Sequence, residues 1–180
     1  IGLPSAFAPL TRASSRAVRR VDFGFFDPKE ADFHGLRALL TESGGGNGLL
    51  PEGTVFDVGG LAGVLCEQAE VGSIAKVLAP GSEEADESGD VLGFMSAISL
   101  HHHRKATFAS QLVASYTQRC ADAAARAELQ ALLEAPTTGL LVSCRMLNLP
   151  PPLVPSLVDS LMQDLAWAVE HCDTPAERES

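Results

Sequence analysis

The chain has 180 residues, of which 46% are hydrophobic and 20% charged, and its formal net charge at pH 7 is −10. The composition is that of a globular chain and the length fits one domain, while the acidic excess argues against direct binding of nucleic acid, whose phosphates require clustered cations. No stretch approaches the roughly 20 apolar residues that span a bilayer, so we expect no transmembrane segment.

The first 20 residues differ in charge from the rest. They contain Arg12, Arg16, Arg19 and Arg20 and no acidic residue, which leaves −14 for the other 160 positions. An Arg-rich, Ser-containing, acid-free leader is typical of organellar transit peptides, and residues 5–9 resemble the phenylalanine-containing leader of plastids acquired by secondary endosymbiosis. The alternative is a solvated basic arm. We therefore expect a basic arm or transit-peptide remnant at 1–20, a domain at 21–172 and a polar tail at 173–180.

Residues 21–68 predict a strand followed by two helices. Residues 21–26 are aromatic and β-prone. Asp27 before a proline is typical of a helix start, and Asp32 is a second possible cap. This first helix is expected to reach Thr41. After a glycine-rich break, residues 57–68 carry apolar residues at helical spacing.

An acidic loop is expected inside a long hairpin. Residues 71–78 and 91–100 are predicted strands on either side of residues 80–90. The acidic residues of this loop are Glu83, Glu84, Asp86, Glu87 and Asp90. They would attract a basic protein partner.

The second half predicts helices at 107–120 and 121–135, a strand and a last helix. Residues 139–147 carry apolar side chains on both faces, which predicts a strand in the interior of the sheet. The last helix is expected at 153–171. One broad apolar stripe on it would contain Val154, Leu157, Val158, Leu161, Leu165 and residues 167–169.

The sequence contains no pattern of residues typical of catalysis. No phosphate loop and no G-x-S-x-G elbow occurs. His101, His102 and His103 follow a predicted strand, from which alternate side chains point in opposite directions, so they indicate a polar strand exit rather than a metal site. The four cysteines lack zinc-ligand spacing and favour buried thiols, although a disulfide stays open. We predict no catalytic residue, no metal and no cofactor.

Four segments of the chain resemble the BCCIP family of eukaryotic nuclear protein-binding proteins. They are residues 32–40, residues 71–76, the acidic loop leading into 91–100, and residues 139–151. The resemblance implies an α+β fold with a mixed or antiparallel sheet and flanking helices, similar to the acetyltransferases (GNAT-like) but incomplete. It also implies a nuclear or cytoplasmic chaperone or escort of proteins, including a basic ribosomal protein. Family members continue further and have acidic leaders, which favours either a truncated relative whose sheet edge a partner covers or a member sent to an organelle.

Three functions follow from these observations. The first is a non-catalytic binding domain that escorts or assembles a basic client, with the acidic loop and the four arginines as partner-binding residues. The second is an accessory structural subunit of an organellar multiprotein complex, such as one of a plastid. The third is acetyl transfer, against which the missing pyrophosphate loop argues.

Overall fold

The computed structural model describes residues 21–44, 55–68, 70–79, 81–82, 90–147 and 149–171. Within these ranges lie four strands: β1 (Phe23–Phe26), β2 (Ser73–Val77), β3 (Gly93–Ile98) and β4 (Leu140–Arg145). The helices are α1 (Phe33–Gly44), α2 (Val58–Glu67), α3 (Thr107–Arg119), α4 (Ala123–Glu134) and α5 (Val154–His171), with short 3-10 turns η1 (Glu30–Asp32) and η2 (Pro151–Leu153). The prediction of an α+β chain is confirmed, whereas its similarity to the acetyltransferases stays a prediction.

The strands form one antiparallel sheet in the order β1-β2-β3-β4. Each strand pairs with its neighbour in the sequence, for example Ile74 with Phe94 and Phe94 with Cys144. The hairpin predicted around the acidic loop is therefore confirmed, since β2 pairs with β3. At its base Leu92 donates its N–H to the carbonyl of Ala75 at 2.9 Å.

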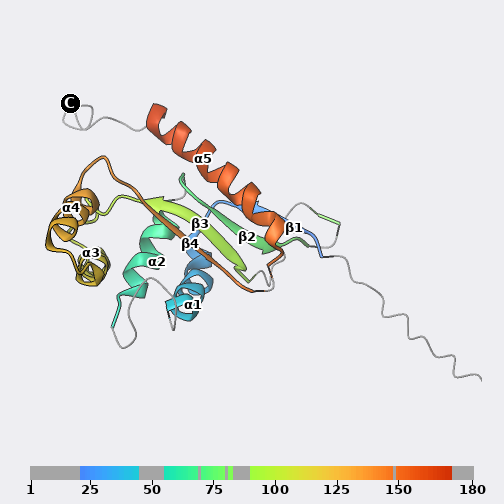
Figure 1. Ribbon diagram of the computed structural model, residues 1–180. Helices are drawn as coiled ribbons and strands as arrows, with labels where there is room; N and C mark the ends of the chain where they lie inside the picture. The colour runs from blue at the N-terminus through green and yellow to red at the C-terminus, as the bar shows by residue number, and fades with distance from the viewer. Residues whose placement is uncertain are drawn as a thin grey trace, which may run out of the picture.

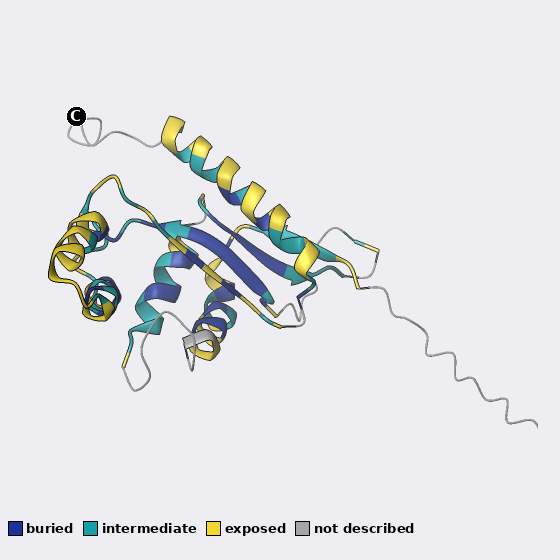
Figure 2. Cartoon of the chain, viewed as in Figure 1, coloured by how far each residue is buried: buried dark blue, intermediate teal, exposed yellow. Residues whose placement is uncertain are grey.

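Helices cover both faces of the sheet (Figure 1), with α1 and α2 on one side and α5 on the other, while α3 and α4 lie beside one end. The larger core is on the α1 and α2 side, where Leu36 and Leu61 pack with Phe94, Ile98 and Val142. These positions recur with period 2 on the strands and at helical spacing on the helices, which is why the sequence pattern predicted them. Figure 2 shows the buried residues concentrated in the sheet and on the inward sides of α1 and α2.

A smaller cluster joins α5 to the opposite face of the sheet. Leu157 and Leu161 of α5 pack against Met95 of β3. Two polar contacts fix the helix beside β2: the hydroxyls of Ser73 and Ser160 lie 2.9 Å apart, and the Gly72 N–H donates to the Asp164 carboxylate at 3.1 Å.

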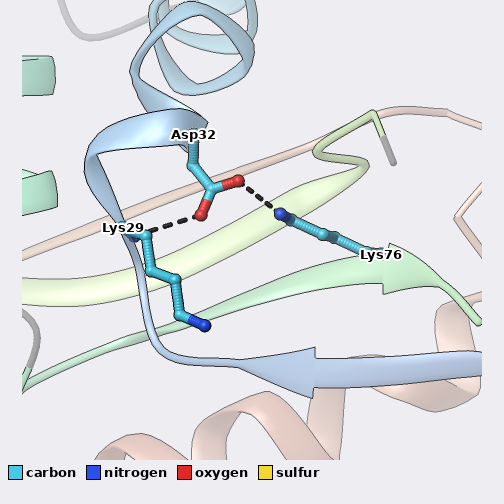
Figure 3. Close-up of polar contacts among 3 residues, drawn as sticks. All are labelled: Lys29, Asp32 and Lys76. Atoms are coloured by element: carbon cyan, nitrogen blue, oxygen red, sulfur yellow. Dashed lines mark hydrogen bonds and ion pairs between the residues drawn. The ribbon is translucent and has the colours of Figure 1, made fainter. Parts of the chain in front are cut away.

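An ion pair joins η1 to the sheet (Figure 3). The Asp32 carboxylate accepts from the Lys76 ammonium of β2 and, at 3.0 Å, from the Lys29 N–H. Asp32 is only 4% exposed. Neither Asp27 nor Asp32 occupies the predicted cap position, because the N-cap of η1 is Lys29 and η1 precedes α1. Asp32 instead closes the turn from its third position, by accepting from the Lys29 N–H.

The predicted interior strand lies at the edge of the sheet. Residues 139–147 were expected to have neighbours on both sides, but β4 pairs only with β3 among the described strands. Its residues alternate between covered and open positions, with Val142 and Cys144 buried and Leu141, Ser143 and Arg145 exposed. Apolar residues on both faces of β4 therefore do not indicate a central strand. On one face they are buried in the core, and on the other they are exposed.

Candidate binding surface

Most of the predicted partner-binding residues lie outside the described residues. These are Glu83, Glu84, Asp86, Glu87, Arg12, Arg16, Arg19 and Arg20. Asp90 is described, and it is exposed shortly before β3 begins. Asp90 lies in the connection between β2 and β3, and its contact with a partner stays a prediction.

Large exposed apolar side chains gather on another part of the described chain. Six of the nine lie on or just after β4 and on α5: Leu141, Leu147, Val158, Met162, Trp167 and Val169. Figure 2 shows the outer side of α5 as an almost continuous exposed band. Several exposed apolar side chains on neighbouring elements often mark a binding surface, so we take β4 and α5 as the candidate surface.

One side of β4 presents backbone groups that pair with no other strand in the described part of the chain. The Met146 N–H donates to the Leu92 carbonyl at 2.8 Å, which marks Met146 and Leu92 as a hydrogen-bonded pair of the β3–β4 ladder. Because such pairs alternate in antiparallel sheets, Val142 and Cys144 also bond toward β3. The amides and carbonyls of Leu141, Ser143 and Arg145 therefore point away from β3, along the open edge.

The side chains of these same three residues extend from the face of the sheet that α5 covers. On β3 that face is closed, because Met95 is buried beneath α5. On β4 it is open, because Leu141, which pairs with Ala97, remains 57% exposed. The cover that α5 provides therefore ends between β3 and β4.

A second apolar stripe on α5 borders this opening. Val158, Met162, Leu165 and Val169 are spaced so that, at 3.6 residues per turn, they share one side of the helix. Three sides of α5 follow one another around the helix axis. The side that hydrogen-bonds beside β2 is next to the side that packs on Met95, and that side is next to this stripe. The stripe therefore faces the β4 side, and Leu165 belongs to the same cluster as Ala97.

The charged residues around this surface are mostly acidic. Asp159 and Glu170 are exposed on α5, and Asp164 is half-buried. The helix contains no lysine or arginine. Arg145 is exposed at the end of β4. An approaching segment therefore meets apolar groups bordered by negative charge along the helix.

Two cavities lie away from this surface. One of about 620 Å³ lies between α3, α4 and the turn after β3, with Leu100, Val113 and Leu133 among its apolar residues and Arg104 at its side. The Arg104 guanidinium already donates to the His101 carbonyl at 3.0 Å, and the His101 ring contacts the Glu134 carbonyl. Its main polar groups are thus engaged within the protein.

The other cavity, of about 540 Å³, lies between η1, α1 and α2. His34, Cys66 and Glu67 are among its lining residues. Burial, reinforced by the nearby carboxylate of Asp32, raises the pKa of the Cys66 thiol, so that this sulfur is mostly protonated near neutral pH and a weak nucleophile. Burial likewise lowers the pKa of His103, which favours its neutral ring.

Clusters of metal ligands and membrane-length apolar helices are both absent from the described residues. Across them, no three His, Cys, Asp or Glu side chains gather closely enough to hold a metal ion. No helix in those ranges is long and apolar enough to cross a membrane. Cys66, Cys120 and Cys144 are thiols. Cys144 is buried as predicted, whereas Cys66 and Cys120 are only partly buried, and Cys172 lies outside the described residues.

Known proteins similar to this chain share its fold and much of its sequence. The model of the BCCIP family matches residues 18–179. Protein BCCIP homolog of Arabidopsis thaliana is 34% identical over 161 residues, covering 88% of this chain and 45% of the relative. Protein bcp1 of Aspergillus oryzae is 32% identical over 157 residues, covering 85% and 50%. The crystal structure of BCP1 from Saccharomyces cerevisiae has a TM-score of 0.60 at 21% identity, covering 88% of this chain and 62% of that one.

The fold and the surface together define an antiparallel α+β domain whose apolar residues are open along one edge of the sheet. With the match over residues 18–179, the chain belongs to the BCCIP family. It spans about half the length of the curated relatives it matches.

Sequence reasoning missed this surface for a specific reason. The sequence predicted one broad apolar stripe on α5, but in the structure Leu157 and Leu161 are buried while Val158 and Val169 are exposed. A sheet face covers one side of a helix. The predicted apolar stripe was broader than the side of a helix that a sheet can cover. This width was the signal that part of the stripe would remain exposed.

Proposed function

We propose that this chain is a non-catalytic protein-binding domain that escorts or assembles a basic protein client. The observation that carries the proposal is the exposed apolar surface of β4 and α5, bordered by Asp159 and Glu170. Such a surface is costly to leave in water and fits another protein. Because the net charge of the chain is −10, we expect the client to be positively charged.

The two parts of this surface have different roles. The acidic residues attract a cationic protein and speed encounter, an effect that salt screens. The apolar side chains then give a contact that persists at higher salt, because burial of apolar area does not depend on charge. An escort that shields a basic protein from nucleic acid needs both.

The acid–base chemistry of the described chain supports a binding role over catalysis. The most buried carboxylate, Asp32, is paired with Lys76 and with the Lys29 N–H. The Cys66 thiol has a raised pKa. Neither group is arranged as an activated nucleophile with a base in hydrogen-bond reach.

The test is a solubility assay with a purified basic ribosomal protein of the large subunit. We expect the full chain to keep this client in solution on dilution into low salt and to form a defined complex by gel filtration. Binding should weaken, but not vanish, as salt is raised. If the client sediments equally with and without the chain, it is not a client of this protein and the proposal fails.

The charge contrast between residues 1–20 and the remaining chain favours a second candidate, an accessory subunit of an organellar complex. Four arginines without an acidic neighbour suit anchoring to an acidic surface of a larger assembly. Deletion of these residues separates the two candidates and is described below.

A further inference from the structure

We propose that the cavity between α3, α4 and the turn after β3 binds a small apolar carboxylate, whose carboxylate group pairs with the Arg104 guanidinium. The cavity lies at one end of the sheet (Figure 1), away from the surface of β4 and α5. The inference therefore goes beyond the proposed function and is tested independently of it.

The size and walls of the cavity fit a small molecule. Its volume is about 620 Å³, within the range of roughly 300–1,000 Å³ that ligand pockets span. Its apolar wall comes from Leu100 after β3, from Ala109 and Val113 of α3 and from Leu133 of α4. All of these except Val113 are buried, so the surrounding protein holds most of the wall in place.

The cavity is built by one continuous segment of the chain. Every described residue that lines it lies between Leu100 and Glu134. The His101 Nδ1–H donates to the Glu134 carbonyl at 2.9 Å, which joins the turn after β3 to the end of α4. The shape of the cavity is therefore fixed by contacts within residues 100–134, which lie inside the family match.

Arg104 is the one lysine or arginine among the described residues that line the cavity. A guanidinium has five N–H donors and no acceptor, and the bond from Arg104 to the His101 carbonyl uses only one of its nitrogens. Within the described ranges, no carboxylate forms an ion pair with this side chain. Its other N–H groups are exposed to an incoming ligand and have the planar arrangement that binds both oxygens of a carboxylate.

The hydroxyl groups of the cavity offer no competing donor. The Ser110 hydroxyl donates to the Thr107 carbonyl at 2.9 Å, and the Thr117 hydroxyl donates to the Val113 carbonyl at 2.8 Å. Both protons are therefore used within α3. Arg104 is left as the main group that can hold an anion, while the apolar wall holds the body of the ligand.

The Glu134 carboxylate also lines the cavity and acts in the opposite direction. It is exposed and accepts from the Gln130 amide at 3.0 Å. Like charges repel, so Glu134 weakens the binding of an anion that Arg104 strengthens. Removal of each charge should therefore change the affinity with opposite sign.

Three variants of the full chain and one control test this arrangement. Arg104→Gln removes the cation, Glu134→Gln removes the opposing anion, and Val113→Phe fills the cavity from its wall. Arg119→Gln is the matched control, because Arg119 is an exposed arginine of α3 that does not line the cavity. Thermal unfolding verifies that each variant is folded.

The probe is octanoate, compared with 1-octanol and octylamine, which have the same chain length but no charge or a positive charge. Titrations are followed by the methyl resonances of leucine and valine in the NMR spectrum of the labelled protein. These resonances report both the affinity and the place of binding. We expect octanoate to shift the signals of Leu100, Val113 and Leu133 and to bind more tightly than octanol or octylamine.

Arg104→Gln should weaken octanoate binding by about fivefold, the scale of a partly exposed ion pair, and leave octanol binding unchanged. Glu134→Gln should tighten octanoate binding, Val113→Phe should weaken both ligands, and Arg119→Gln should change neither. No saturable binding of octanoate, shifts confined to methyl groups outside the cavity, or equal effects of Arg104→Gln and Arg119→Gln overturn the proposal. All four variants should still hold the basic ribosomal protein, so failure of carboxylate binding leaves the escort function standing.

Discussion

Asp32 lies at a point where local and long-range structure meet. Its carboxylate fixes the start of η1 through the Lys29 N–H and pairs with Lys76 on β2. Replacing both charged residues together should change the free energy of unfolding little. Replacing only one of them leaves the other charge buried without its partner, which is strongly destabilising. The pair therefore fixes the position of η1 against the sheet more than it raises overall stability.

Replacing Asp32 alone should be strongly destabilising. Asp32→Ala leaves the Lys76 ammonium without its partner, and we expect a loss of about 3 kcal/mol in the free energy of unfolding, measured by urea denaturation. The double variant Asp32→Leu, Lys76→Met should lose less than Asp32→Ala. The exposed Asp27→Ala is the control and should change stability by less than ~0.5 kcal/mol. Equal losses for Asp32→Ala and the control would show that the pair has no structural role.

Gly72 is required by its backbone conformation. Its φ is +128°, and an added Cβ would lie 2.7 Å from the Cβ of Ser96. We expect Gly72→Ala to cost about 1–3 kcal/mol and to disturb the bond from Gly72 to Asp164 that fixes α5. Gly63→Ala, within α2 and with open space around it, should instead stabilise by about 0.5–1 kcal/mol. Thermal unfolding of both variants measures this difference in sign.

At the scale of elements, the hairpin of β2 and β3 carries the acidic loop. The pairing of Ala75 with Gly93 fixes the base of the hairpin, next to the loop, so the loop sequence has little influence on the sheet. Its acidic residues are therefore expected to act on partners rather than on folding.

Reversing the charge of the loop should separate binding from stability. Changing Glu83, Glu84, Asp86 and Glu87 to lysine should leave the free energy of unfolding within ~0.5 kcal/mol of the wild type for each substitution. Association with a basic protein should slow and lose its salt dependence. Stopped-flow rates across a salt series measure this effect, with Glu42→Lys and Glu128→Lys as exposed controls. Unchanged rates would place the electrostatic contact elsewhere.

For the whole molecule, the basic arm of residues 1–20 is separate in charge from the acidic chain that follows. It has no hydrophobic periodicity, so we expect it to add nothing to the stability of the domain. We expect these residues to act in assembly with a partner.

Deletion of residues 1–20 should leave the melting temperature of the domain nearly unchanged. If the chain is an accessory subunit, the deletion should weaken its incorporation into the larger complex, measured by co-purification from cells. A scrambled arm with the same four arginines is the control for charge alone. Normal incorporation of the deletion variant would leave the accessory-subunit hypothesis without its main support.

The element types could be predicted because their signals are local. The periodicity of residues 107–120 and 121–135 predicted α3 (Thr107–Arg119) and α4 (Ala123–Glu134) to within a few residues. The helix predicted at 57–68 is α2, and the Asp57 carboxylate caps it by accepting from the Gly60 N–H. The chain order of β2 and β3 was likewise predictable, because a hairpin joins neighbours in sequence. The start of α1 was predicted several residues too early, because Asp27 has the sequence pattern of a cap. The carboxylate fixed in the structure is instead that of Asp32, which pairs with Lys76, 44 positions away in the sequence.

The sequence by itself determined the class of fold, the acidic charge and the membership of the family, since these depend on composition, periodicity and recurring segments. Only the tertiary structure decided that β4 is an edge strand and that one stripe of α5 stays open. An apolar residue looks the same in sequence whether a neighbour covers it or not. The exposure of Leu141 and Val158 depends on which elements, far apart in the chain, end at that edge, and this is a property of packing alone.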